Sequence, residues 1–421
     1  MFSRMSKFFE DFKCIYELQF GFRAKHSTNH ALIDITENVK HALDNKMHAC
    51  GIFVDLQKAF DTVNHKILLE KLSHYGIRGI ANDWFSSYLS NRSQYVSILG
   101  FESNSLSVLH GVPQGSVLGP LLFLIYINDL HNAIKYSKVY HFADDTNLLH
   151  IDECEQKMQN QVNKDLKSLY QWLLANKISL NCSKTELILF HRPGGVTYES
   201  KINMNGVKIQ PSKYIKYLGL YLDATLSGNH HCDLLVKKLK RANGMLSKAR
   251  HFVPTDEMKS IYYAIFSSHL TYGCQVWGQN INIYTEKVFK LQNRAMRILS
   301  FADFHSDSDP LYKMHNILKL KDLCALQNCL FVHDFLHKKL PTCFNAYFQS
   351  VSDIHATCTK SSTLGCLHIP YFATTKYGLN CITRKCIDSW NSFTKSLNCN
   401  LKDMTRSVLK RKISTFCIES Y

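Results

Sequence analysis

Two adjacent acidic residues between two short apolar runs limit the fold of this chain more than any other feature. Val139 to Ala143 and Thr146 to His150 both have the composition of β-strands, and only Asp144 and Asp145 separate them. Because two residues are the length of the tightest hairpin turns, we predict a β-hairpin with both acids at its tip. Adjacent acids in a turn are usually solvated, so a function for this pair depends on what surrounds it.

A third acid lies at the end of another predicted strand. Residues 50–56 (CGIFVDL) are short, β-branched and apolar, which is typical of a buried strand, and they place Asp55 near its end. Helical spacing of apolar residues predicts a helix before this strand, at about 28–44, and another after it, up to Gly76. If the two strands are neighbours in one sheet, Asp55 lies beside the hairpin acids.

This arrangement suits one kind of chemistry. Transfer of a nucleotide to a 3′-hydroxyl uses two divalent ions, one at the attacking oxygen and one at the triphosphate and leaving group. Mg²⁺ prefers oxygen ligands and is usually held by one or two carboxylates together with substrate phosphates. A strand-end aspartate beside a hairpin-tip pair would supply such carboxylates.

The charge of the chain favours a polyanionic partner. Lys and Arg number 50 against 34 Asp and Glu, a formal net charge of +16 over 421 residues. The longest apolar run, residues 117–127, is too short to cross a bilayer and predicts a buried helix, and the first fourteen residues lack the pattern of a signal peptide. We therefore expect an intracellular protein of cytoplasm and nucleus, not secreted, with no membrane partner and with reduced cysteines.

Several motifs stand in a recognisable order. Residues 53–61 (FVDLQKAFD), 111–120 (GVPQGSVLGP) and 142–145 (FADD) resemble the palm motifs of reverse transcriptases, in particular those of non-LTR (LINE-type) retrotransposons of the jockey and chicken-repeat type. Further similar segments extend the resemblance over about residues 19 to 222: residues 19–23 with Ser27 and Thr28, residues 75–78 with Trp84, Tyr88, Leu89 and Arg92, residues 181–190, and residues 217–220.

The resemblance implies an α/β fold, a right-hand polymerase palm built as an antiparallel sheet with helices, together with partial fingers and an α-helical thumb. It implies an RNA-directed DNA polymerase that extends a DNA 3′ end on an RNA template by two-metal nucleotidyl transfer. The implied partners are an RNA template, a DNA primer, deoxynucleoside triphosphates and the element's own RNA as a ribonucleoprotein. The oligomeric state stays open.

The resemblance also implies roles for individual residues. Asp55, Asp144 and Asp145 would bind two Mg²⁺ ions, with Mn²⁺ as an alternative, and Lys184 would contact the triphosphate or give a proton to pyrophosphate. Phe60 matches the aromatic that lies under the incoming sugar and excludes a 2′-hydroxyl. The other implied contacts are Gln114, Gly115 and Arg23 with the nucleotide, and the turn at Tyr217, Leu218 and Gly219 with the primer 3′ end.

Each of these residues also has a plainer interpretation. Phe60 could be an ordinary core aromatic, the loop around Gln114 a surface turn, and Lys184 a solvated lysine. Residues 217–220 could be a simple edge strand.

A basic amphipathic segment follows the last of these motifs. Between Asp233 and Arg250, apolar residues at helical spacing oppose a run of cations: Lys237, Lys238, Lys240, Arg241 and Lys248. A solvated helix face would look similar, but after a palm this pattern fits a thumb helix that follows the nucleic-acid backbone through phosphate contacts.

Cysteines near the C-terminus invite a zinc interpretation, which the spacing disfavours. Seven and four residues separate successive candidates, whereas structural zinc sites use closer pairs, so we expect ordinary thiols. The residues concerned are Cys358, Cys366, Cys381 and Cys386, with His355 and His368 nearby.

We expect four regions: partial fingers at 1–50, the palm with the catalytic motifs at 51–225, a helical thumb at 226–345, and a C-terminal region of unclear role at 346–421. The family's first fingers motif should precede Gln19, so the fingers look truncated, and this copy could be inactive. Elements of this type usually carry an endonuclease before the polymerase, and we expect none in this chain. One alternative is a catalytically silent, element-derived nucleic-acid-binding protein, which the retained Asp triad and Gln114 loop disfavour. Another is an intron maturase or an RNA polymerase, which Phe60 and the same loop disfavour.

Overall fold

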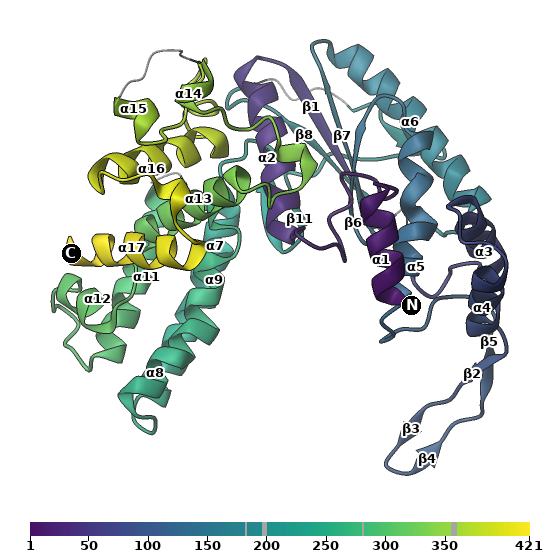
Figure 1. Ribbon diagram of the computed structural model, residues 1–421, viewed down its shortest axis with the longest axis horizontal. Helices are drawn as coiled ribbons and strands as arrows, with labels where there is room; N and C mark the ends of the chain where they lie inside the picture. The colour runs from purple at the N-terminus through teal and green to yellow at the C-terminus, as the bar shows by residue number, and fades with distance from the viewer. Residues whose placement is uncertain (182, 196–199, 280–281, 355–359) are drawn as a thin grey trace. The chain divides into compact units, whose positions relative to one another are not determined.

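The computed structural model spans residues 1–421 and describes all of them except 182, 196–199, 280–281 and 355–359. The chain divides into two compact units (Figure 1). The first unit consists of Met1–Ala31, Met47–Leu189 and Gly194–Ser212, and the second of Leu32–Lys46, Phe190–Pro193 and Lys213–Tyr421.

A four-stranded sheet forms the centre of the first unit, with the strand order β6-β7-β1-β8. Its strands are β1 (His48–Val54), β6 (Lys138–Phe142), β7 (Asp145–Asp152) and β8 (Glu186–Phe190). β7 pairs antiparallel with both β1 and β6. Six of the seven residues of β1 are buried, because apolar side chains cover both faces of the sheet, which explains its unbroken apolar sequence.

Helices cover this sheet and supply most of the core. They are α1 (Phe2–Asp11), α3 (His65–His74), α4 (Ile80–Leu89), α5 (Gly119–Ile127) and α6 (Glu155–Ala175), with the short helix η1 (Asn128–Ala133) after α5. Eight of the nine residues of α5 are buried, which confirms the buried helix predicted from the apolar run. Cys50, Ile52 and Val54 of β1 share one hydrophobic core with α5 and α6.

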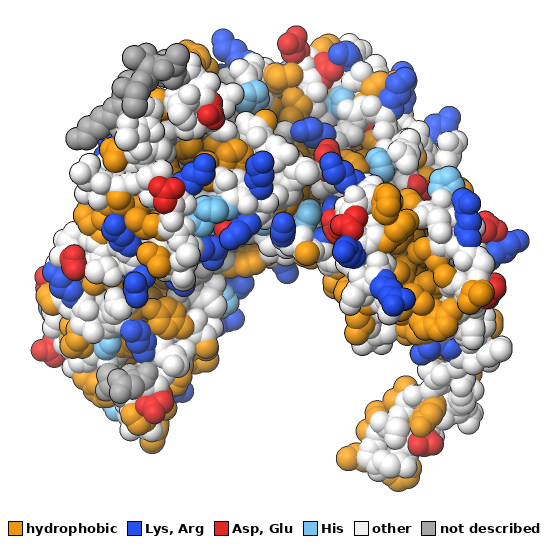
Figure 2. Space-filling view, in the orientation of Figure 1, with side chains coloured by type: hydrophobic (Ala, Val, Ile, Leu, Met, Phe, Trp, Pro, Cys, Tyr) orange, Lys and Arg blue, Asp and Glu red, His pale blue; other side chains and the backbone are white. Residues whose placement is uncertain are grey.

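Two smaller β-structures belong to the same unit. β9 (Asn203–Met204) and β10 (Val207–Lys208) form a short hairpin. β2 (Arg92–Gln94) pairs with β5 (Leu106–Val108), and β3 (Ser97–Ile98) pairs with β4 (Phe101–Glu102), which makes a long arm after α4 (Figure 1). Hydrophobic side chains cover the tip of the arm (Figure 2), where Leu99 is 95% exposed and Phe101 is 83% exposed.

The second unit is mostly helical. Its longest segment begins with a hairpin of β11 (Tyr214–Tyr217) and β12 (Leu220–Asp223), which leads into the predicted basic helix, α7 (Asn229–Ala249). The later elements are α8 (Thr255–Tyr262), the π-helix η2 (Tyr263–Ser267), α9 (Ser268–Thr271), α10 (Cys274–Trp277), α11 (Ile283–Leu299), α12 (Asp309–His315), α13 (Leu320–Leu336), η3 (Thr342–Phe344), α14 (Val351–Ile354), α15 (Lys360–Thr363), α16 (Ile382–Ser396), η4 (Leu401–Asp403) and α17 (Arg406–Glu419). Within the described part of the chain, none of the helices has the length and apolar character required to span a membrane.

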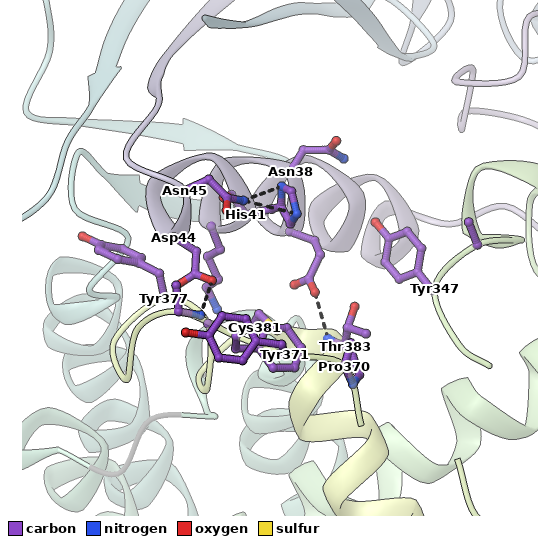
Figure 3. A pocket seen from close by; sticks show the side chains of 16 residues that line it. Asn38, His41, Asp44, Asn45, Tyr347, Pro370, Tyr371, Tyr377, Cys381 and Thr383 are labelled. Carbon is purple, nitrogen blue, oxygen red and sulfur yellow. Dashed lines mark hydrogen bonds between the residues drawn. The ribbon is translucent and has the colours of Figure 1, made fainter. Parts of the chain in front are cut away.

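The C-terminal region packs against α2 (Thr28–Asp44), whose bounds match the predicted helix. The carboxylate of Glu37 accepts hydrogen bonds from the backbone amides of Ile382 (2.8 Å) and Thr383 (3.0 Å), where it faces the positive end of the α16 dipole. Asp44 accepts one from the amide of Thr374 at 2.8 Å, and the buried Lys40 donates to the carbonyl of Asn380 at 2.9 Å. Glu37, Lys40, Asp44 and Thr383 border a pocket of about 360 Å³ (Figure 3).

Candidate active site

The predicted acidic hairpin is present, with its turn centred one residue earlier than expected. Phe142 pairs with Asp145 across the turn, so Ala143 and Asp144 occupy its two central positions. Ala143 has a φ of +57°, a left-handed conformation that is uncommon for a residue with a Cβ. In the adjacent pair of strands Val54 is opposite Thr146, so Asp55 follows the end of β1 alongside Asp145.

A short segment before α2 supports the hairpin turn. Gln19 is 2% exposed, and its Oε1 accepts hydrogen bonds from the amides of Gly21 (2.9 Å) and Ala143 (3.0 Å). The backbone on either side of Gln19 pairs with His141 of β6. A Cβ on Gly21 would lie 2.3 Å from the nitrogen of Ala143, so only glycine permits this approach. The sequence grouped Gln19 with a fingers motif but gave no sign of this contact.

The three aspartates influence one another electrostatically. Burial, followed by the charges of Asp144 and Asp55, raises the pKa of Asp145 to about 6. Burial and the charge of Asp55 also raise the pKa of Asp144. The charge of Asp55 therefore adds to burial in disfavouring the ionised forms of both hairpin acids.

Asp55 has a polar neighbour that the sequence did not single out. The side-chain amide of Asn181 donates to Oδ2 of Asp55 at 3.0 Å, and the backbone amide of Asn181 donates to the carbonyl of Asp55 at 2.9 Å. Lys184 lies at the rim, with Nζ 4.0 Å from Oδ2 of Asp55 and 71% of its side chain exposed. One solvated ammonium does not balance three carboxylates.

The predicted nucleotide contacts Phe60 and Gln114 lie on two connected turns. The ring of Phe60 stacks on that of Phe123, with centroids 4.3 Å apart. The backbone amide of Val112 donates to the carbonyl of Phe60, and the side-chain amide of Gln114 donates to Asp61 at 2.7 Å. Asp61 therefore holds the Gln114 loop beside Phe60, a role that the sequence did not predict.

Gly115 and Arg23 have very different surroundings. Gly115 is exposed, with a φ of +76° and open space where a Cβ would be. Arg23 is 10% exposed and forms a two-fold ion pair with Glu10 of α1, at 2.9 and 3.0 Å. A phosphate contact by Arg23 therefore stays a prediction that requires Glu10 to release it.

The predicted primer contacts and the predicted backbone contacts belong to the second unit. Leu218 and Gly219 form the turn of the β11–β12 hairpin, both with positive φ, while Tyr217 is buried. The hydroxyl of Tyr272 donates to the carbonyl of Leu218. Leu235, Leu239, Ala242 and Leu246 bury one side of α7, and the predicted cations Lys237, Lys238, Lys240, Arg241 and Lys248 are all exposed.

The donor chemistry at Asp55, Asp144 and Asp145 fits a hard divalent cation. All three side chains offer carboxylate oxygens, and a cation between them would offset the repulsion that adds to burial in raising the pKa values of Asp144 and Asp145. Among the residues that the structure describes, no three His, Cys, Asp or Glu side chains are gathered tightly enough to hold a metal ion alone. Phosphate oxygens of a substrate usually complete such a site.

The C-terminal cysteines stand apart from this chemistry. Cys366, Cys381 and Cys386 are buried free thiols. Cys358 and His355 lie outside the described residues, so the zinc interpretation is untested at those two positions.

An antiparallel sheet with carboxylates at the ends of its inner strands, together with a helical second unit, is typical of templated polymerases. Residues 2–222 match the family model described as reverse transcriptase (RNA-dependent DNA polymerase), so the chain belongs to that family. The match confirms the predicted resemblance, and the α/β fold agrees with it.

The relatives of this chain come from mobile elements. It is 29% identical to the RNA-directed DNA polymerase from mobile element jockey of Drosophila melanogaster over 75% of this chain and 35% of that protein. It is 26% identical to a probable RNA-directed DNA polymerase from transposon BS of the same species, over 75% of this chain and 36% of that protein. The chain thus spans about a third of the length of these relatives. Apo telomerase from Candida tropicalis superposes with a TM-score of 0.39 at 12% identity, over 77% of this chain and 54% of that one, which is too low to support an argument.

Proposed function

We propose that this chain is an RNA-directed DNA polymerase of a non-LTR retrotransposon, which extends a DNA 3′ end on an RNA template with deoxynucleoside triphosphates. The observation that carries the proposal is the register of β1 and β7, which sets Asp55 beside Asp144 and Asp145. Membership of the reverse transcriptase family and the mobile-element relatives support it. The element's own RNA is the proposed template, and the cytoplasm and nucleus are the proposed places of action.

The proposed ligands of two Mg²⁺ ions, with Mn²⁺ as an alternative, are Asp55, Asp144 and Asp145. When bound, such ions activate the attacking 3′-hydroxyl and neutralise charge on the triphosphate and the leaving group. Asn181 orients the carboxylate of Asp55 through its side-chain amide. Lys184, at the rim, is the proposed residue that contacts the triphosphate or gives a proton to pyrophosphate.

The neighbouring turns are suited to selecting the sugar. Because Phe123 supports one face of Phe60, the ring cannot retreat from a 2′-hydroxyl in that direction. Gln114, held by Asp61, is the proposed contact to the sugar and the templating pair. The exposed cations of α7 are the proposed contacts to the template–primer backbone, and the turn at Leu218 and Gly219 is the proposed primer contact.

Primer extension on poly(rA)/oligo(dT) tests the proposal. Wild type should incorporate dTTP in the presence of Mg²⁺, and Asp144→Ala should abolish incorporation. Asp83→Asn, which changes an exposed acid in the first turn of α4, is the matched control and should retain activity. Incorporation that is absent from the folded wild type would support the silent nucleic-acid-binding alternative, and equal incorporation by wild type and Asp144→Ala would refute the metal-site assignment.

A further inference from the structure

Helix α11 carries four cations on one face. Lys287, Lys290, Arg294 and Arg297 follow one another at spacings of three, four and three residues within Ile283–Leu299. These spacings place all four side chains on one side of an α-helix. Like charges so close together destabilise a helix, and a bound anion would relieve this repulsion. The helix itself contains a single acid, Glu286.

The same cations line a groove that α11 shares with α7. The two helices lie side by side (Figure 1), and the side chain of Asn243 on α7 donates to the carbonyl of Leu291 on α11 at 3.0 Å. The groove has a volume of about 570 Å³, and its lining contains five cations and no acid: Lys240, Lys287, Lys290, Arg294 and Arg297, with Val236, Leu291, Asn293 and Phe304. Asp233 approaches Lys287 only to 4.0 Å, and both side chains are half exposed, so water screens this pair.

An exposed aromatic side chain belongs to the same groove. Phe304 is 67% exposed, on the loop that follows α11. Nε of Arg297 donates to the carbonyl of Ser306 at 2.7 Å, which ties this loop back to the helix. Cations that bind phosphates, together with an aromatic ring on which a base can stack, are the features that bind single-stranded nucleic acid.

This groove lies on the opposite side of α7 from the proposed primer contact. Each residue of an α-helix turns the side-chain direction by about 100°, so Lys238 and Lys240 are separated by about 200° of rotation and face different flanks of α7. After burial, the charge of Lys238 lowers the pKa of His269 in α9, so Lys238 lies near that helix. Tyr272, just past the end of α9, holds the β11–β12 turn. Lys240, which is one of the proposed template–primer contacts, instead borders the groove with α11.

We propose that the groove between α7 and α11 is a second nucleic-acid site, which binds a single-stranded polynucleotide through its phosphates and stacks a base on Phe304. The site goes beyond polymerisation, because the groove lies on the other flank of α7 from the turn that is the proposed primer contact. It would let the protein retain a strand that is not paired with the primer.

Fluorescence anisotropy tests the proposal with a labelled 20-nucleotide RNA and a DNA of the same sequence, without primer or nucleotides. The groove variant is Lys290→Gln with Arg294→Gln. The matched control is Lys410→Gln with Arg411→Gln, which removes the same charge from exposed positions on α17. The groove variant should bind roughly tenfold more weakly, with a salt slope lower by about 1.4, whereas the control should change affinity by less than about twofold. Loss with both oligonucleotides would identify a groove that reads the backbone, and loss with RNA alone one that also reads the 2′-hydroxyl.

Two further measurements separate this proposal from the polymerase proposal. Primer extension on a short pre-annealed RNA–DNA substrate should be unchanged in the groove variant, and Asp144→Ala should bind the single strand like wild type. Phe304→Ala should weaken single-strand binding by at least about fivefold and leave blunt duplex binding unchanged. Equal binding by the groove and control variants, or equal losses for duplex and single strand in Phe304→Ala, would overturn the proposal.

Discussion

Asp145 lies at the end of an inner strand of the sheet, β7, where burial and two neighbouring carboxylates disfavour its ionised form. Its raised pKa, about 6, agrees with the proposed metal site, since a bound cation would offset the repulsion from the neighbouring carboxylates. The structure brings the predicted acids Asp55, Asp144 and Asp145 to neighbouring strands, and their roles stay predictions. The sequence could not predict that Gln19 accepts from Ala143, that Asn181 donates to Asp55, or that Asp61 accepts from Gln114. These contacts join residues 53 to 126 positions apart in the chain.

Replacing Asp145 should stabilise the metal-free protein. The unfolded carboxyl ionises near 3.8 and the folded one near 6, so the folded state binds more protons between these values, and its stability falls as the pH rises through that window. Asp145→Asn removes this loss, so its melting temperature in EDTA should exceed that of wild type at pH 7.5. The difference should shrink at pH 4.5. A variant less stable than wild type at pH 7.5 would contradict the proposed repulsion.

Truncating Phe60 should admit ribonucleotides. Phe60→Ala removes the ring that Phe123 supports, and discrimination between dTTP and UTP in primer extension should fall by about 10- to 100-fold. Phe60→Tyr keeps the ring and is the matched control, expected to discriminate like wild type. Unchanged discrimination in Phe60→Ala would leave Phe60 as an ordinary packing residue.

At the scale of elements, the patterns that predicted well are local ones. The two-residue separation of apolar runs predicted the β6–β7 hairpin, and apolar spacing predicted α2 and α7. The contacts of α2 with the C-terminal region could not be predicted from the sequence, because Glu37 and Ile382 are 345 positions apart and no local pattern indicates that they meet. The turn position differed by one residue because Gln19 and Gly21 stabilise the unusual conformation of Ala143.

Close packing of the Gln19–Gly21 segment against the hairpin gives a sharp substitution test. Gly21→Ala would place a Cβ 2.3 Å from the nitrogen of Ala143, which should cost about 1–3 kcal/mol of stability and lower activity by displacing the acids. Gly244→Ala, in the interior of α7 with open space around it, should instead stabilise by about 0.5–1 kcal/mol. Urea unfolding measures both; a Gly21→Ala protein as stable and active as wild type would show that the turn can move freely.

Asp223 joins the β11–β12 hairpin to α7. Burial alone would raise its pKa, but hydrogen bonds from Ser227, Thr225 and Gly228 outweigh burial and lower it. Because the folded pKa is depressed, the stability that Asp223 contributes is present above the ordinary value of 3.8 and is lost as the pH falls through the lower folded value. Asp223→Ala should cost about 1–3 kcal/mol at pH 7, and urea unfolding should show wild type losing this advantage toward pH 3. An advantage independent of pH would exclude the ionised form as its source.

At the scale of the whole molecule, the net charge of +16 is unevenly distributed. The first unit carries the three carboxylates at the ends of β1 and β7, and the second unit carries the basic helices. Composition predicted the polyanionic partner, and the ordered motifs predicted the palm. Neither indicated the groove between α7 and α11, because its charges come from two helices whose pairing depends on the tertiary fold.

The most direct test of the central claim is metal binding at the three aspartates, measured by electron paramagnetic resonance of Mn²⁺ in the presence of an RNA–DNA template–primer and a non-hydrolysable deoxynucleotide. We expect about two Mn²⁺ ions per wild-type chain, the loss of at least one in Asp144→Asn, and no change in the Asp83→Asn control. Equal Mn²⁺ binding by wild type and Asp144→Asn would contradict it.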